Sequence, residues 1–155
     1  MRPGKGFAGL QMIATYLIMA YLQVGELRDN FEISTSINLA KKRFVVSDAD
    51  GNGVLQVRAD DIEIDFNGAV LTSTSDPAKA PREEFKGIGI NLNGHKGVRI
   101  KNAQIHGYKF NLFADKADGL QIVGGDFSYA VAHRIRVDGK AVDHWLVLRD
   151  LAKWR

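Results

Sequence analysis

Apolar and polar positions alternate in a short phrase that occurs three times between residues 60 and 129. In each copy, a turn with Asp or Gly is followed by an apolar residue, any residue and a second apolar residue. This period of two is typical of a strand with one buried face. We therefore expect three short strands whose buried side chains form one internal ladder. The apolar pairs of the ladder are Ile62 and Ile64, Val98 and Ile100, and Leu120 and Ile122.

The spacing of the phrase indicates a repeat. Val98 and Leu120 are 22 residues apart, and Ile62 and Val98 are 36 apart, which is 22 plus an insertion of 14. A second series of strands precedes the phrase, and there Ile90 and Leu112 are again 22 residues apart. Short strands in a repeat of this length, separated by Gly, Asn and Asp turns, predict a solenoid. Each strand should then lie parallel to its counterpart, about 4.8 Å away.

The insertion covers residues 72–85 and contains Pro77 and Pro81. Proline and small polar residues are incompatible with a central strand, so this stretch predicts a long loop. A long loop on one face of a solenoid often builds a binding edge. The alternative is a surface insertion that the fold tolerates.

The N-terminal segment, residues 1–30, differs from the repeat. Arg2 and Lys5 precede an apolar run over residues 10–24, and a polar stretch follows at residues 26–30. The order basic, apolar, polar is that of a secretory signal, which predicts export, or of an uncleaved anchor as the one contact with a membrane. The alternative is a helix that caps the N-terminal end of the solenoid.

The repeat weakens toward the C-terminus. Ile135 and Val137 have the pattern of a further strand, but they follow Leu112 and Ala114 one position later than the repeat requires. Residues 141–154 have apolar side chains at roughly helical spacing and predict a cap helix. Without a cap, the last coil would present an unpaired edge for self-association. The expected organisation is a terminal segment at 1–30, the solenoid at 31–137 and an irregular or helical cap at 138–155.

Four stretches resemble coils of the right-handed parallel β-helix of the pectate-lyase-like superfamily, namely residues 48–55, 65–71, 87–90 and 98–108. The resemblance implies an all-β fold of about three to four coils between terminal helical caps. The superfamily includes pectate and alginate lyases, polygalacturonases and uronan epimerases, most of them secreted. It therefore implies an exported protein that binds or processes an acidic polysaccharide. Its members usually have more coils, so the alternative is a truncated, structural or adhesive module without activity.

Composition changes this picture little. The chain has 155 residues with 45% hydrophobic and 25% charged side chains, which is typical of one folded domain. The net charge of +3 permits an anionic partner such as an acidic polysaccharide. Nucleic acid is not predicted, because no stripe of basic and aromatic residues is present. The absence of cysteine excludes disulfides and thiolate metal sites.

One turn has the spacing of half a calcium loop. Asp48, Asp50 and Asn52 are followed by Gly53, and calcium prefers several hard oxygen ligands of this kind. The bidentate carboxylate that closes such a loop is missing, because Ala59 occupies its place. The alternative is an ordinary turn, since Asp, Asn and Gly are common turn residues.

Charged side chains should form outward-facing columns on the repeated strand. Two interpretations follow. The first is charge pairing between adjacent strands, which contributes a fraction of a kcal/mol per pair. The second is a groove in which a base removes a sugar proton while cations neutralise a uronate. The columns are Glu63, Arg99 and Gln121, followed by Asp65, Lys101 and Val123.

His106 alternates with apolar neighbours and is therefore predicted to point outward, beside Val70 and Ser128. Tyr108 and Lys109 follow it, and the three side chains are candidates for acid–base chemistry or for stacking on a sugar ring. The alternative is an ordinary surface histidine. No residue is carried over as catalytic from the superfamily, because no lyase or hydrolase motif matches residue by residue. No cofactor other than calcium is suggested.

Overall fold

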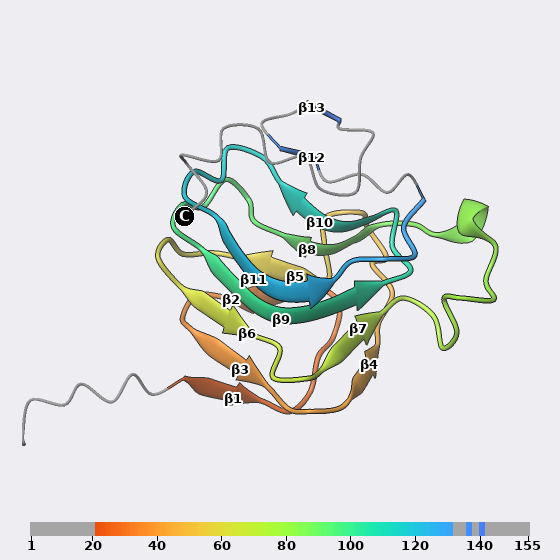
Figure 1. Ribbon diagram of the computed structural model, residues 1–155, viewed down its shortest axis with the longest axis horizontal. Helices are drawn as coiled ribbons and strands as arrows, with labels where there is room; N and C mark the ends of the chain where they lie inside the picture. Colours follow the sequence, from red (N-terminus) through yellow and green to blue (C-terminus); the bar gives the residue numbers. More distant parts are fainter. Residues whose placement is uncertain (1–20, 132–135, 138–139, 142–155) are drawn as a thin grey trace, which may run out of the picture.

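The computed structural model describes residues 21–131, 136–137 and 140–141. These ranges are all-β, with two sheets and no α-helix (Figure 1). Sheet A contains β1 (Leu22–Val24), β3 (Ile37–Leu39), β4 (Arg43–Val45), β6 (Glu63–Asp65), β7 (Val70–Thr72), β9 (Arg99–His106) and β11 (Gln121–Asp126). Sheet B contains β2 (Phe31–Ile33), β5 (Leu55–Val57), β8 (Ile88–Asn91), β10 (Phe110–Ala114), β12 (Arg136–Val137) and β13 (Lys140–Ala141).

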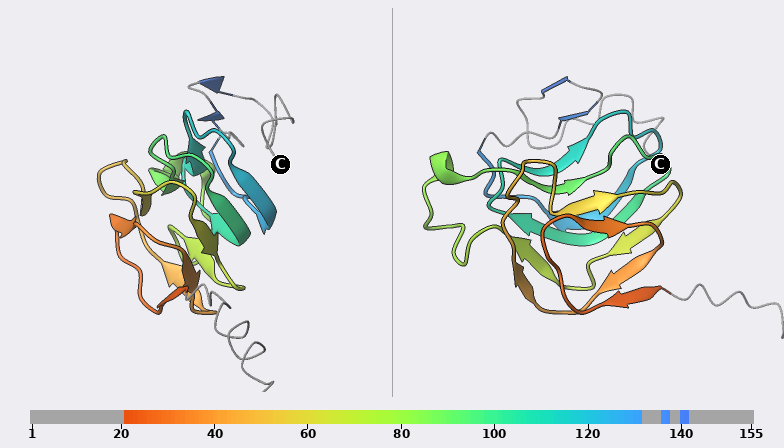
Figure 2. Two further views of the ribbon diagram at one scale, coloured as in Figure 1. Left: turned by 90° about the vertical axis from the view of Figure 1, so that its left-hand side faces the viewer. Right: turned by 180° about the vertical axis from the view of Figure 1, so that it is seen from behind.

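The chain passes repeatedly from sheet B to sheet A and back. We call each passage a rung: β2–β4, β5–β7, β8–β9 and β10–β11. Strands of successive rungs pair in parallel, as β2–β5–β8–β10–β12 in one sheet and as β3–β6–β9–β11 in the other. Figure 2 shows the stacked rungs from the side and from behind. Parallel stacking of this kind is compatible with the solenoid predicted from the repeated phrase.

The predicted internal ladder is confirmed. Ile64 pairs with Ile100, and Ile100 pairs with Ile122. Ile64 and Ile100 are fully buried, and Val98 and Leu120 are at most 1% exposed. Successive side chains of a strand point to opposite faces, so the residues between these positions lie on the outside of sheet A. The outward columns also have the predicted register, because Glu63 pairs with Arg99, which pairs with Gln121.

The register changes within the second rung. Four residues, 66–69, separate β6 from β7, but β9 pairs with both strands and has only Asn102 and Ala103 at this level. The longer turn includes Asn67 and Gly68, both with positive φ. His106 consequently pairs with Thr72, and its predicted position beside Val70 is wrong by two residues.

The predicted long loop joins β7 to β8 and contains the 3₁₀-helix η1 (Arg82–Glu84). It extends beyond the strands on one side of the molecule (Figure 1). Two of its side chains, Pro77 and Phe85, are nevertheless buried. The loop is therefore packed against the rungs at both of these points.

The ends of the described chain are strands. Leu22–Val24, the end of the apolar run, forms β1 and pairs with β3, so this part is not helical. At the other end, Val137 pairs with Ala114, which is the offset seen in the sequence, and β13 then adds an antiparallel strand. The predicted helices over residues 10–20 and 142–154 lie outside the described residues. Within the described ranges, no helix has the length and apolarity needed to cross a bilayer.

Candidate functional site

Five polar side chains gather on the outside of sheet A around one carboxylate. The Tyr21 hydroxyl donates a hydrogen bond of 3.1 Å to Glu63 Oε1. Lys101 Nζ lies 3.4 Å from the same oxygen and 3.8 Å from Asp65 Oδ2. Arg99 Nε lies 3.7 Å from Glu63 Oε2. We call Tyr21, Glu63, Asp65, Arg99 and Lys101 the outer-face cluster.

The pairing register of sheet A brings the charged residues of the outer-face cluster together. Glu63 and Asp65 come from β6, and Arg99 and Lys101 stand opposite them on β9. The Glu63 backbone N–H donates to the Ser36 hydroxyl at 2.9 Å, which fixes the start of β6 against the preceding rung. The Glu63 side chain is only 16% exposed. This carboxylate therefore lies in a partly dry setting, where its attraction to cations is stronger than in water.

The ion pairs in this cluster are loose. Their N···O distances of 3.4–3.8 Å exceed the 2.7–2.9 Å that is typical of charge-assisted hydrogen bonds. The side chains of Arg99 and Lys101 are 46% and 31% exposed, so both keep donors that face water. The hydrogen bond to Glu63, together with burial and the charge of Glu63, raises the pKa of Tyr21, which stays protonated and donates. Such a surface can accept an anionic group.

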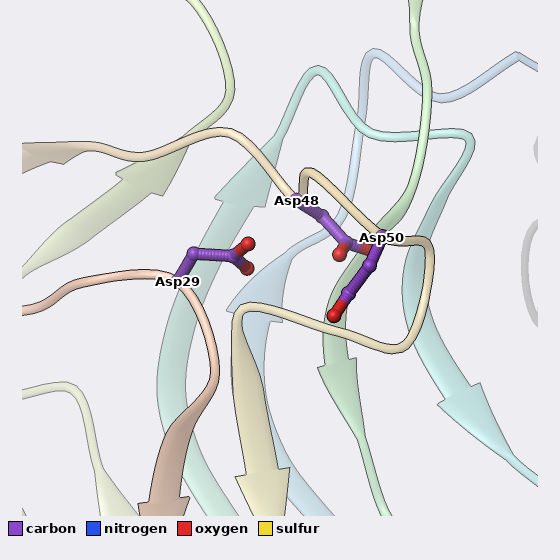
Figure 3. A group of neighbouring side chains, drawn as sticks. All are labelled: Asp29, Asp48 and Asp50. Atoms are coloured by element: carbon purple, nitrogen blue, oxygen red, sulfur yellow. The ribbon is translucent and has the colours of Figure 1, made fainter.

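A second cluster contains three carboxylates. Oxygens of Asp29, Asp48 and Asp50 lie within 4.8 Å of one another, and the side chains are directed into the same gap (Figure 3). Asp29 precedes β2, whereas Asp48 and Asp50 belong to the turn between β4 and β5. The structure thus places Asp48 and Asp50, two predicted metal ligands, beside Asp29, which comes one rung earlier in the chain.

The hydrogen bonds of this cluster match those of a turn. Asp48 accepts from the backbone N–H groups of Gly51, Gly53 and Ile88, at 3.0, 3.1 and 2.7 Å. Asn52, the third predicted ligand, donates its amide to Asp50 and directs its oxygen toward the Gln56 amide. The oxygen of Asn52 is therefore not available within the cluster. Many of the oxygen atoms that could bind a cation therefore already accept hydrogen bonds from the protein.

Burial and hydrogen bonding have opposite effects on Asp50. Desolvation raises its pKa, but hydrogen bonds from the Asn30 side chain and the Asn52 backbone outweigh it and leave the pKa below 3.8. These donors keep the group ionised without a metal. The calcium hypothesis stays a prediction from the sequence, since a cluster of carboxylates with amide donors is also an ordinary feature of turns.

His106 and Tyr108 are not the exposed side chains that the sequence predicts. His106 is 8% exposed and Tyr108 is fully buried. The Tyr108 hydroxyl donates to the Val46 carbonyl at 2.6 Å, and burial raises its pKa. The two-residue shift in the second rung explains the change, because it brings the long loop, with the buried Pro77, next to Gly107. The Tyr108 hydroxyl is therefore used within the fold.

His106, Ser128 and Asp126 lie together but do not form a catalytic triad. His106 Nδ1 is 3.1 Å from the Ser128 carbonyl oxygen, which can only accept, so Nδ1 carries the proton. It therefore cannot take a proton from the Ser128 hydroxyl at 3.4 Å. His106 Nε2 lies 4.0 Å from Asp126 Oδ2, beyond hydrogen-bond distance. The histidine holds two rungs together instead.

The chain matches no protein-family model, no curated protein and no solved structure in the three comparisons. No catalytic residue is therefore transferred to it from a relative. The candidate sites rest on the geometry of the described residues and on their chemistry.

Sequence reasoning missed two residues of these clusters. Tyr21 belongs to the apolar run that predicted a signal or a cap, and nothing in the run indicates a strand that returns to sheet A. Asp29 lies a whole rung before Asp48 in the chain. The signal that could have found it is the offset between Phe31 and Leu55, which is close to the repeat length and sets the turn before β2 beside the turn before β5.

Proposed function

We propose that the protein is a right-handed parallel β-helix module, similar to the pectate-lyase-like superfamily, that binds an acidic polysaccharide. The handedness is supported by a general rule, since connections between parallel strands of one sheet are right-handed in about 98% of cases. The rule applies here because successive strands within each sheet are parallel and are joined through the other sheet. A polysaccharide ligand also agrees with the signal-like order at the N-terminus and with export.

The outer-face cluster is the observation that supports this function. Lys101 and Arg99 are attached to a rigid strand, they lie one residue apart on the same face, and their ion pairs are loose. A uronate carboxylate can join this network with less loss of side-chain entropy than free lysines would require. The Tyr21 hydroxyl and the amide of Gln121 extend the surface with groups that suit sugar hydroxyls.

Binding is favoured over turnover. Of the candidates for acid–base chemistry, His106 and Tyr108 are held by backbone carbonyl groups in the interior. Glu63 has both Arg99 and Lys101 beside it, and these ion pairs favour its role in binding over that of a base. We therefore place binding first and elimination second.

Binding is tested with polygalacturonate and alginate against uncharged dextran, by calorimetry at low and high salt. We expect Arg99→Gln and Lys101→Gln each to weaken binding by about threefold, because each removes one partly exposed charge. Binding should also fall with salt, since screening acts on exposed charges. Lys42→Gln is the matched control: Lys42 is also ion-paired and partly exposed, but it lies outside the cluster.

Equal binding of dextran, or equal losses in the control variant, contradicts this function. A rise in ultraviolet absorbance during incubation with the polyuronates would show unsaturated sugar ends, and elimination would then replace simple binding. In that case, Glu63→Gln should abolish the rise while leaving the fold intact.

A structural or adhesive module is the second candidate. The observation behind it is the outer edge of β11, which pairs only with β9 among the described residues and exposes Val123 at 40%. An unpaired edge of this kind can accept a strand from another copy. We expect concentration-dependent association in light scattering, and Val123→Lys should suppress it. A monomer at all concentrations, with or without the substitution, would rule this candidate out.

A further inference from the structure

The long loop encloses a pocket against the turn between β4 and β5. The pocket has a volume of about 240 Å³. Its polar lining includes Ser47 and Asp48 from the turn, and Thr74, Glu84 and Lys86 from the loop. The buried ring of Phe85 adds an apolar surface. The insertion, which is absent from the later rungs, therefore creates a concave site at a place where the repeat alone has none.

Hydrogen bonds hold the backbone on two sides of the pocket. Asp48 is held by the Ile88 N–H at 2.7 Å, which ties the turn to the end of the loop. Gly87, with a φ of +70°, permits this contact, because a Cβ atom there would lie 2.5 Å from the Asp48 Cβ. Val46 N–H donates to the Thr72 carbonyl at 2.9 Å on the other side. A site held in this way loses little entropy on binding.

The charge around the pocket is mainly negative. The lining has two carboxylates, Asp48 and Glu84, and one cation, Lys86, and Asp48 lies within 4.8 Å of Asp29 and Asp50. Among the described residues, the side chains of Glu84 and Lys86 have no ion-pair partner. The pocket thus offers one free carboxylate, one strong donor and hydroxyl groups that can both donate and accept.

We propose that this pocket binds one amino sugar unit, that is, a sugar ring with several hydroxyls and a protonated amine. The volume is below the minimum of about 300 Å³ that is usual for drug-sized ligands, so it suits a single ring. The hydroxyls of Ser47 and Thr74 and the ammonium of Lys86 match ring hydroxyls, and the carboxylate of Glu84 matches the amine. A uronate is disfavoured by the negative charges of Glu84 and Asp48. The site is separate from the outer-face cluster and does not depend on the function proposed for it.

The test is an NMR titration of the labelled protein at neutral pH with glucosamine, glucose, glucuronate and butylamine. We expect glucosamine to bind in the millimolar range, as is usual for small ligands with few contacts, and to shift the amides of Ser47, Thr74 and Lys86. Glucose should bind more weakly, and glucuronate and butylamine most weakly. Glu84→Gln and Thr74→Val should each weaken glucosamine binding by about tenfold.

Glu83→Gln is the matched control, because Glu83 lies beside Glu84 on η1 but does not line the pocket. It should leave the affinity unchanged. The proposal is overturned if glucosamine shifts no pocket amide, if glucuronate binds as strongly, or if butylamine alone binds as strongly. Arg99→Gln should not affect this titration, and Glu84→Gln should not affect polyuronate binding. The two proposals are therefore tested independently.

Discussion

Single side chains connect the rungs where the strands end. The Tyr108 hydroxyl reaches the Val46 carbonyl across two rungs, and the Asn111 amide donates to the carbonyls of Phe127 and Ser128 at 2.7 and 2.8 Å. Buried polar atoms are costly unless they are paired, and here each is paired with the backbone of another segment of the chain. These residues therefore stabilise the turns, in addition to the backbone hydrogen bonds between rungs, such as that from Gly107 N–H to the Tyr129 carbonyl.

Asp48 gives the clearest prediction for a single residue. Asp48→Ala removes the acceptor of three backbone N–H groups, one of which comes from the next rung. We expect the free energy of unfolding to fall by about 2 kcal/mol, the usual cost of leaving partly buried donors unpaired. Urea denaturation measures it. Asp50→Ala should cost less, because Asp50 is exposed, and equal losses would contradict the role assigned to Asp48.

The sequence predicts the candidate site only in part, and individual residues show why. Glu63, Arg99 and Lys101 were predicted to stand together, because the repeat length alone sets their register. His106 and Tyr108 were placed wrongly, because two residues in the turn at 66–69 shift the second half of the rung. Periodicity cannot detect such a shift when both turns consist mainly of Asn, Gly and Ala.

At the scale of elements, residues with a left-handed backbone conformation form a column across the strands of sheet A. Asn102, with a φ of +54°, donates its amide to Asp65 Oδ1 at 3.1 Å. Gly124, with a φ of +66°, follows Val123, which pairs with Lys101, and so continues this column. Both residues adopt the left-handed region that Asn and Gly tolerate best.

Gly124→Asn should extend this column. A Cβ atom at Gly124 would meet Asn102 Oδ1 at 3.5 Å, an ordinary contact. Asn tolerates the left-handed region and restricts the unfolded chain, so we expect a gain of about 0.5 kcal/mol in the free energy of unfolding. Chemical denaturation provides the measurement. Gly87→Asn is the control and should destabilise, because its Cβ would clash with Asp48. A loss of stability in both variants would refute the column.

The elements themselves were largely predictable. The strands of the three later rungs follow from alternation and spacing, as in β6, where Ile64 is buried between two partly exposed residues. Residues 22–24 were not predicted as a strand, because an apolar run without alternation does not distinguish strand from helix. The paired strand β13 was also missed, since two residues are too few to show a period.

At the scale of the molecule, the described rungs are electrically balanced. They contain as many acidic as basic side chains, so the net charge of +3 comes from residues outside the described ranges. Several carboxylates are stabilised in the ionised form. The Lys96 backbone N–H and His95 lower the pKa of Asp60, and Lys79 lowers that of Asp76. A carboxylate whose pKa is lowered by folding stabilises the native state only while it is ionised.

Stability should therefore be lost in acid. Above the ordinary Asp value of 3.8, these groups are ionised in both states and their contribution is complete. As the pH falls below it, the unfolded chain takes up protons first and the contribution is lost through the folded pKa values. We expect the melting temperature, followed by circular dichroism, to be nearly constant from about pH 7 to 5 and to fall below about pH 4. Asp60→Asn should reduce this fall, and an unchanged acid profile in that variant would exclude Asp60 as a contributor.

The insertion between β7 and β8 also decides how much foreign sequence the chain can accept. Ile64 meets Ile100 across 36 residues, whereas Ile100 meets Ile122 across 22. The entropy of closing a loop grows with the logarithm of its length, so the longer step costs only about 0.4 kcal/mol more. Replacing residues 78–84 with an unrelated peptide, which leaves the buried Pro77 and Phe85 in place, should thus leave the rungs intact. The loop between β7 and β8 is therefore a position at which a foreign peptide can be inserted and presented on the surface of the fold.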